Sequence, residues 1–257
     1  MGTERQNGSL YTNIVGKVAV VEFGHPAGNS FVLDMLHRFA GEIDKLSVND
    51  AISVIVLKSE GDRAFCGGAS FEELTNISNL EDGKVFFSGF AKVINAMRKC
   101  KKVIVGRVQG KTVGGGVGLA AACDYVFASE AASIRLSEIS IGIAPLVIAP
   151  AVERKIGTAA LSEMSLSPTE WKSAYWAQEK GLFSKVFDDI KELDKELDFF
   201  ANQLSGYNPE GLAEWKAVLW EGTSHWDALL TERAAITGKL VLSEFTKNAL
   251  SKFKKQT

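Results

Sequence analysis

The sequence contains few cysteines, and they are not spaced in a way that would pair them or bind a metal ion. Cys66, Cys100 and Cys123 are the only three among 257 residues, and no two of them form a CxxC motif. An odd number of cysteines without that spacing indicates neither a disulfide framework nor a zinc site. We therefore expect no metal centre and no disulfide-stabilised extracellular domain.

Long apolar runs and a strong excess of one charge are also absent. The longest apolar stretches, such as 117–123, are far too short to span a bilayer. A formal net charge of −2, from 29 basic and 31 acidic residues, gives no reason to expect nucleic acid or a membrane surface as the main partner. The first fifteen residues have no apolar signal region and no Arg/Ser-rich transit pattern, so we expect a cytoplasmic protein.

The chain has only five prolines and no Ser/Gly-rich linker, which argues against freely tethered domains. With 46% apolar and 23% charged residues, it is long enough to bury a sizeable core. Up to about residue 190 the hydrophobic pattern alternates between strands and helices, and beyond it the pattern is helical. This order predicts an α/β core followed by a helical appendage. The expected elements are strands within 11–23 and at 52–57, 103–108, 125–128 and 133–136, helices at 30–47 and 82–97, and a loop at 61–70.

Two segments share a pattern in which a strand enters a glycine turn that opens a helix: AFCGGASFEEL (64–74) and QGKTVGGGVGLA (109–120). Helix N-termini present unpaired N–H groups and the positive end of the helix dipole. Two such ends facing one another could hold one oxyanion between them. No Gly-Lys-Ser/Thr closes the second turn and no GxGxxG spacing occurs there, so a phosphate loop or dinucleotide site is not indicated. Two helix starts packed tightly on a sheet remain the alternative interpretation.

The two segments resemble the enoyl-CoA hydratase/isomerase (crotonase) superfamily. The first resembles the family pattern AFxAGADxxE, with departures at Gly67 and Ser70. The second begins RVQGKTVGGGVGLAAACDYVFASE and resembles xVxGxAxGGGxELAxxCDxxxAxE, with departures at Thr112 and Gly118. The resemblance continues through SEISIGIAPLVIAPAVERKIG to the C-terminal ERAAITGKLVLSEFTKNALSKF. It therefore covers nearly the whole chain from about Val18.

The resemblance implies the family's fold, an α/β superhelix of ββα turns (the ClpP/crotonase fold). Residues 1–195 would form the crotonase-like core with the coenzyme A and oxyanion sites. Residues 196–257 would form a helical C-terminal region that builds homotrimers, often paired into hexamers. Aromatic residues in that region are expected in the core first and at an interface second: Trp215, Trp220, Trp226 and Phe245.

The resemblance also implies an acyl-CoA enzyme of fatty acid metabolism, a lyase or an isomerase. The N–H groups of Ala69 and Gly115 would hold the thioester oxygen and stabilise an enolate. Coenzyme A would be part of the substrate, and no separate cofactor is expected. Phe253, Lys254 and Lys255 would reach the nucleotide of a neighbouring subunit, the alternative being a solvated tail. The remaining residues implied in substrate binding are Cys66, Gly67, Gly68, Gly114 and Gly116.

The carboxylates indicate which reaction to expect. Family members that hydrate a double bond place a water between two glutamates, and the corresponding positions here are Gly118 and Glu138. Family isomerases that move a double bond from carbon 3 to carbon 2 work with the later carboxylate alone, and the IGIAP tract (141–145) resembles theirs. The resemblance thus implies 3-enoyl-CoA isomerisation with Glu138 as acid and base. A surface glutamate at a strand end is the alternative. With no second carboxylate nearby, only burial would raise the pKa of Glu138.

Other functions on the same scaffold stay open. A hydratase for short or branched chains, such as methylglutaconyl-CoA, would need a substitute second group, for which Glu72, Glu73 and His225 are the candidates. An acyl-CoA hydrolase, a decarboxylase and a non-catalytic acyl-CoA-binding protein are further alternatives. Ser70 is expected to cap a helix, and Asp124 is expected to be structural.

Overall fold

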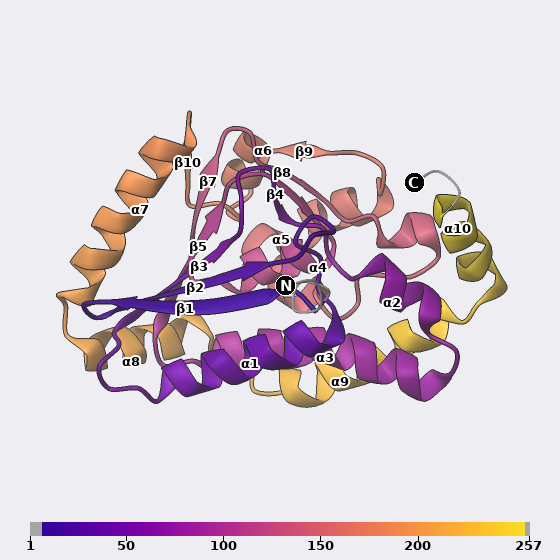
Figure 1. Ribbon diagram of the computed structural model, residues 1–257, viewed down its shortest axis with the longest axis horizontal. Coiled ribbons are helices and arrows are strands. Elements are labelled where there is room, and N and C mark those ends of the chain that lie inside the picture. The colour runs from indigo at the N-terminus through magenta and orange to yellow at the C-terminus, as the bar shows by residue number, and fades with distance from the viewer. Residues whose placement is uncertain (1–6, 255–257) are drawn as a thin grey trace.

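Figure 1 shows a computed structural model of the protein, which describes residues 7–254. The larger of two sheets has the strand order β1-β2-β3-β5-β7-β10. Its first pair is antiparallel and its other pairs are parallel. The strands β3, β5 and β7 are almost wholly apolar, as expected for strands that helices cover on both faces. The bounds are β1 Ser9–Val15, β2 Val18–Gly24, β3 Val54–Ser59, β5 Val103–Val108, β7 Tyr125–Ser129 and β10 Lys185–Phe187.

A second, smaller sheet has the order β4-β6-β8-β9. Each of β4, β6 and β8 follows a strand of the larger sheet and precedes a helical segment, so the chain repeats a ββα unit. This arrangement confirms the predicted α/β superhelix. The bounds are β4 Ala64–Cys66, β6 Lys111–Val113, β8 Ser133–Arg135 and β9 Lys172–Ser173, with α2 Phe71–Asn76, α4 Gly115–Ala122, α5 Ala149–Leu166 and α6 Ala174–Glu179. The loop predicted at 61–70 contains β4, and β6 and β9 were not predicted, because strands of two or three residues show no periodicity.

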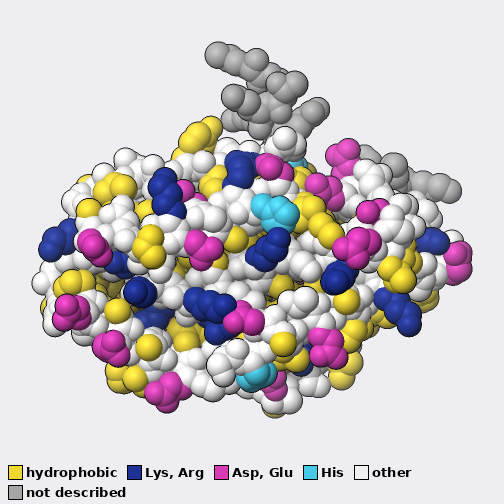
Figure 2. All heavy atoms as spheres, turned by 90° about the horizontal axis from the view of Figure 1, so that it is seen from below, with side chains coloured by type: hydrophobic (Ala, Val, Ile, Leu, Met, Phe, Trp, Pro, Cys, Tyr) yellow, Lys and Arg dark blue, Asp and Glu magenta, His cyan; other side chains and the backbone are white. Residues whose placement is uncertain are grey.

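A layer of three helices covers one face of the larger sheet (Figure 1). They are α1 (Leu33–Ser47), α3 (Leu80–Lys99) and α9 (Trp226–Val241). The helices α3 and α9 approach closely at Gly83, where a Cβ atom would lie 2.7 Å from the carbonyl oxygen of Gly238. Lysine and arginine side chains are interspersed with acidic ones over the outer surface of this layer (Figure 2). One example is the ion pair of Lys99 with Asp227, at 2.6 Å.

The chain after residue 190 is helical, as predicted, and continues from α7 (Ile190–Ser205) to α8 (Pro209–Leu219), α9 and α10 (Glu244–Lys254). The helix α7 covers the opposite face of the larger sheet (Figure 1). Its buried residues Leu193, Leu197 and Ala201 pack against apolar side chains of β2, β3, β5 and β7. The predicted boundary between the core and the C-terminal region, after residue 195, falls inside α7. This helix therefore belongs to both regions as one continuous element.

Asp124 ties the C-terminal helices to the core, as expected of a structural residue. Its carboxylate accepts hydrogen bonds from the Trp220 indole N–H and the Ile104 backbone N–H, at 2.8 and 2.7 Å. It also forms an ion pair with the buried Lys216, at 2.8 Å. The Trp220 and Trp226 rings are buried and meet edge to face, with centroids 6.0 Å apart, which confirms the core prediction for both.

The core prediction is wrong for the other two aromatic residues, since the exposed fraction is 61% for Trp215 and 66% for Phe245. Lys216 is the buried residue of α8 and pairs with Asp124, and adjacent residues on a helix point in different directions. Trp215 therefore faces outward. Phe245 lies in the first turn of α10, where its ring contacts Gly142 but stays mostly uncovered.

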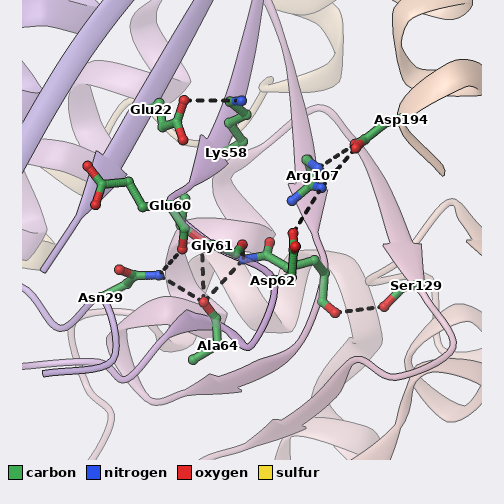
Figure 3. A network of polar contacts seen from close by, with 12 residues as sticks. Glu22, Asn29, Lys58, Glu60, Gly61, Asp62, Ala64, Arg107, Ser129 and Asp194 are labelled. Atoms are coloured by element: carbon green, nitrogen blue, oxygen red, sulfur yellow. Dashed lines mark hydrogen bonds and ion pairs between the residues drawn. The ribbon is translucent and has the colours of Figure 1, made fainter. Parts of the chain in front are cut away.

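A network of buried polar groups holds the segment that leads into the first glycine turn (Figure 3). The side-chain amide of Gln109 donates to the carbonyl oxygens of Gly61 and Ala64, at 2.9 and 3.2 Å. The Asn29 amide donates to the same Ala64 oxygen at 2.9 Å, and Ser129 Oγ donates to the Gln109 carbonyl at 2.7 Å. These contacts join the segments before the two glycine turns, so they fix the position of one turn relative to the other.

The backbone crossing beside Gln109 leaves no room for a side chain at Gly110. A Cβ atom there would lie 1.6 Å from the carbonyl oxygen of Arg63, so the two segments would have to separate. We expect Gly110→Ala to lower the free energy of unfolding by several kcal/mol, measured by urea denaturation. Gly41→Ala is the matched control, because Gly41 lies within α1 and a Cβ atom on it would meet no neighbouring atom within 4 Å. It should stabilise the protein by about 1 kcal/mol. Equal changes in the free energy of unfolding for Gly110→Ala and Gly41→Ala would contradict the close contact of Gly110 with Arg63.

Candidate active site

A cavity of about 450 Å³ lies where the two glycine turns meet η1 (Glu138–Ile141), a short 3-10 helix after β8. Its walls come from both turns, from helices α2 and α3, and from the segment between β8 and α5. Most of the wall is apolar, and its lining residues include Gly67, Gly68, Ala69, Phe90, Val113, Gly114, Gly115, Arg135, Glu138 and Ile148. Its size lies within the range of small-molecule binding sites.

The first turn presents an unpaired backbone N–H at Ala69. Phe31 donates to the Gly68 oxygen at 2.7 Å, and Ser70 donates to the Phe31 oxygen at 2.8 Å, as in one rung of a parallel ladder. Ala69 lies between the two residues that bond to Phe31, so its own N–H points away from Phe31. Within residues 7–254 that N–H donates no hydrogen bond. Ser70 Oγ accepts from the Glu73 N–H at 3.3 Å, which confirms Ser70 as the helix cap.

At each glycine of the second turn, a different neighbouring residue occupies the space that a side chain would need. Gly114 has φ +53°, and a Cβ atom on it would lie 2.6 Å from Oε1 of Glu138. A Cβ atom on Gly115 would lie 2.3 Å from the Phe90 ring, and one on Gly116 would lie 2.6 Å from Cβ of Cys66. The third contact joins the second turn to the first. No larger residue fits at any of these positions without displacing a neighbour.

Gly115 opens α4, and its N–H makes no hydrogen bond within the described part of the chain. Gly115 and Ala69 line the same cavity. The two turns touch beside them, since a Cβ atom on Gly68 would lie 2.8 Å from the Val113 oxygen and 3.6 Å from the Gly115 nitrogen. The site therefore offers two fixed backbone donors to a ligand oxygen.

Glu138 supplies the carboxylate of the cavity. Burial raises the pKa of Glu138 to about 7, and the positive charge of Arg135 and a backbone hydrogen bond oppose the rise without cancelling it. Oε2 of Glu138 is enclosed and has no hydrogen-bond partner among residues 7–254. Burial is thus the cause of the raised pKa, as the sequence led us to expect. A carboxyl group with this pKa can both accept and return a proton at neutral pH.

The place of the missing second carboxylate is filled by an apolar side chain. Gly118 lies within α4, and a Cβ atom on it would lie 2.4 Å from Cγ2 and 2.5 Å from Cβ of Ile148. Ile148 itself lines the cavity. Glu138 is the only carboxylate among the described residues that line it. The contact between Gly118 and Ile148 could not be seen in the sequence, because thirty residues separate them.

The structure does not bring the candidates for a second group into this cavity. Glu72 is exposed on α2, and His225 is exposed at the start of α9. Glu73 is partly buried, and its Oε2 accepts from the Leu33 N–H at 2.7 Å, at the start of α1. Burial raises the pKa of the Glu73 carboxyl. None of the three lines the cavity.

The remaining predicted residues take different places. Gly67, Gly68 and Gly114 line the cavity, whereas Cys66 and Gly116 pack directly behind it. Burial raises the pKa of the Cys66 thiol to about 12, so the thiol is neutral, and its Sγ accepts from the Gly68 N–H at 3.4 Å. The side chains of Phe253 and Lys254, at the end of α10, and all of Lys255 lie outside the described residues.

Arg135 lines the cavity and was not identified from the sequence. It is the last residue of β8, between the buried Ile134 and Leu136. This alternation of buried neighbours is the one indication in the sequence that the Arg135 side chain points away from the core.

No group of three or more potential metal-ligating residues is found between residues 7 and 254. Over the same residues, none of the helices is long and apolar enough to span a membrane.

Comparison with known proteins identifies the family. The family model for enoyl-CoA hydratase/isomerase matches residues 13–252. A peroxisomal Delta(3,5)-Delta(2,4)-dienoyl-CoA isomerase of Arabidopsis thaliana is 29% identical over 203 residues, covering 74% of this chain and 72% of the relative. A probable enoyl-CoA hydratase of Bacillus subtilis is 26% identical over 238 residues, covering 92% of each chain.

The fold comparison agrees with the sequence comparison. The crystal structure of an enoyl-CoA hydratase from Bacillus halodurans superposes with a TM-score of 0.87 at 20% identity, covering 95% of this chain and 99% of that one. The chain belongs to the enoyl-CoA hydratase/isomerase family and is an enzyme of the lyase or isomerase type.

Proposed function

We propose that the protein converts 3-enoyl-CoA thioesters into 2-enoyl-CoA thioesters, with Glu138 as its acid and base and the N–H groups of Ala69 and Gly115 as its oxyanion site. The observation that carries this proposal is that the cavity offers one carboxylate, with its Oε2 enclosed, and has Ile148 in the place of a second. Coenzyme A enters as part of the substrate.

The proposed mechanism needs one group for both proton transfers. The Glu138 carboxylate takes a proton from carbon 2, and the electron pair moves onto the thioester oxygen. The resulting dienolate oxygen accepts hydrogen bonds from the two N–H groups. Protonated Glu138 then returns the proton to carbon 4, and the double bond now joins carbons 2 and 3. An oxyanion donor of this kind contributes about 2.7–4 kcal/mol to the barrier reduction.

Hydration of a 2-enoyl thioester is the second candidate, because the Bacillus subtilis relative that covers 92% of the chain is named a probable hydratase. Hydration requires a base for the attacking water while carbon 2 gains a proton. One carboxylate serves both roles less readily than two. The Arabidopsis thaliana relative, by contrast, is named an isomerase.

We infer that the helical C-terminal region assembles the protein into a trimer or hexamer. The exposed rings of Trp215 and Phe245 support this inference, because large aromatic side chains at the surface are typical of interface anchors. Contact of Phe253 and Lys254 with the nucleotide of a neighbouring subunit stays a prediction.

Light scattering tests the assembly. The mass should be near three or six times the chain mass of 27.8 kDa. Trp215→Ser should lower it towards the chain mass if Trp215 anchors an interface. A monomer at micromolar concentration would contradict the inference.

Glu138→Gln tests the role of the carboxylate. Isomerisation should fall by about 10²–10⁴-fold while coenzyme A thioesters still bind, because the amide keeps the shape but cannot accept the proton. In the wild type, kcat/KM should rise as the pH increases through about 7, because only the ionised Glu138 can act as the base. Glu73→Gln is the control, since the amide oxygen can still accept from Leu33, and its rate should match the wild type. An active Glu138→Gln enzyme would refute the assignment.

Ile148 and Gly118 together test why the enzyme works with one carboxylate. Gly118→Glu alone should reduce stability without adding hydratase activity, because its side chain collides with Ile148. Gly118→Glu combined with Ile148→Gly should raise water addition to a 2-enoyl thioester above either single variant. Two close carboxylates raise one pKa further, so the gain should grow with pH. A wild-type enzyme that hydrates 2-enoyl thioesters rapidly and ignores 3-enoyl ones would contradict the proposal.

A further inference from the structure

We propose that Arg135 binds a carboxylate at the far end of the acyl chain, so that the substrates are enoyl-CoA thioesters of short dicarboxylic acids. The inference rests on the proposed function only in taking the cavity as the acyl site.

The position of Arg135 places its side chain on the cavity side of the smaller sheet. Its register partner is Val113, and both residues line the cavity. The Gly114 N–H donates to the Arg135 carbonyl oxygen at 2.9 Å. A backbone hydrogen bond therefore joins Arg135 directly to the turn that carries Gly115.

The guanidinium group is held in place without a direct ion pair, although its charge acts on the Glu138 carboxyl of the same cavity. It lies over the Trp171 ring, 4.4 Å from the centroid, which fixes its plane. Its Nε is enclosed and has no hydrogen-bond partner within residues 7–254. Two arginines that are more deeply buried have acidic partners, since Arg98 pairs with Asp227 at 3.0 Å and Arg107 with Asp194 at 2.5 Å, whereas Arg135 is partly exposed. An enclosed donor of a charged group without a partner is costly, and a ligand anion would satisfy it.

The rest of the cavity favours a carboxylate on the acyl chain as that anion. Arg135 is the only cationic residue among the described residues that line a mostly apolar wall. A purely aliphatic chain would leave Nε of Arg135 without a hydrogen-bond partner, whereas a carboxylate matches the planar guanidinium. A phosphate of coenzyme A has similar chemistry, but the pantetheine arm separates the phosphates from the thioester, and Arg135 lies beside the thioester turn.

Binding of saturated thioesters tests the inference without any reaction. Glutaryl-CoA and valeryl-CoA have five-carbon acyl chains and differ in ending with a carboxylate or a methyl group. By isothermal titration calorimetry the wild type should bind glutaryl-CoA more tightly. Arg135→Gln should lose about 10- to 100-fold of the glutaryl-CoA affinity, as for a lost charge-assisted hydrogen bond, and keep that for valeryl-CoA. Lys111→Gln is the control, because Lys111 lies over the same ring at 5.3 Å without lining the cavity, and the preference should persist.

Each contrary result is distinct. Equal binding of both thioesters by the wild type, or an equal loss for both in Arg135→Gln, would overturn the inference, the second result indicating a phosphate contact. A changed pH–rate profile with an unchanged preference would also overturn it and leave Arg135 as a residue that only tunes Glu138. If Arg135→Gln does not fold, Arg135→Lys should bind glutaryl-CoA with a weakened preference over valeryl-CoA, because lysine keeps the charge but not the planar guanidinium. An Arg135→Lys variant with the full wild-type preference would overturn the inference. An Arg135-dependent preference in a protein that isomerises no 3-enoyl thioester would refute the proposed function alone.

Discussion

The close approach of two backbone turns is the constraint on which the rest of the site depends. A side chain on Gly68 would strike the Val113 oxygen, and one on Gly116 would strike Cys66, so the turns meet backbone to backbone. Only this contact brings the N–H groups of Ala69 and Gly115 into one cavity. The Gln109 amide holds the approach from outside by joining the segment before the first turn to the strand before the second. The fold thus positions the donors without using any side chain of the site.

Enclosing the Glu138 carboxyl raises its pKa at a cost in stability. Its pKa lies near 4.5 in the unfolded chain and at about 7 in the folded one, so the folded state holds the proton more tightly. The stability therefore falls as the pH rises from 4.5 to 7, and above 7 the full cost is present. At 1.36 kcal/mol per pKa unit it amounts to roughly 3 kcal/mol. A second buried carboxylate would add to this cost, and the apolar Ile148 in its place avoids that addition.

The features that could be predicted from the sequence were those set by local chemistry. The two glycine turns and the Ser70 cap follow from short patterns, and the structural Asp124 and the choice of Glu138 follow from the family resemblance. The missed features depend on contacts across the fold. β4 and β6 are too short to show a period and exist because they pair with each other. Ile148 meets Gly118, and Arg135 meets Trp171, only after the chain has folded.

The link between β8 and η1 would connect the proposed recognition of a carboxylate to the proposed proton transfer. Arg135 and Glu138 lie three residues apart, and the hydrogen bond from Gly114 to the Arg135 carbonyl fixes this link against the second turn. The positive charge of Arg135 lowers the pKa of Glu138 and so weakens it as a base. A substrate carboxylate that pairs with Arg135 would offset that positive charge and so raise the pKa of Glu138. With an acidic acyl chain bound, the ionised Glu138 would be a stronger base, and the rise in rate that follows its ionisation would move to higher pH.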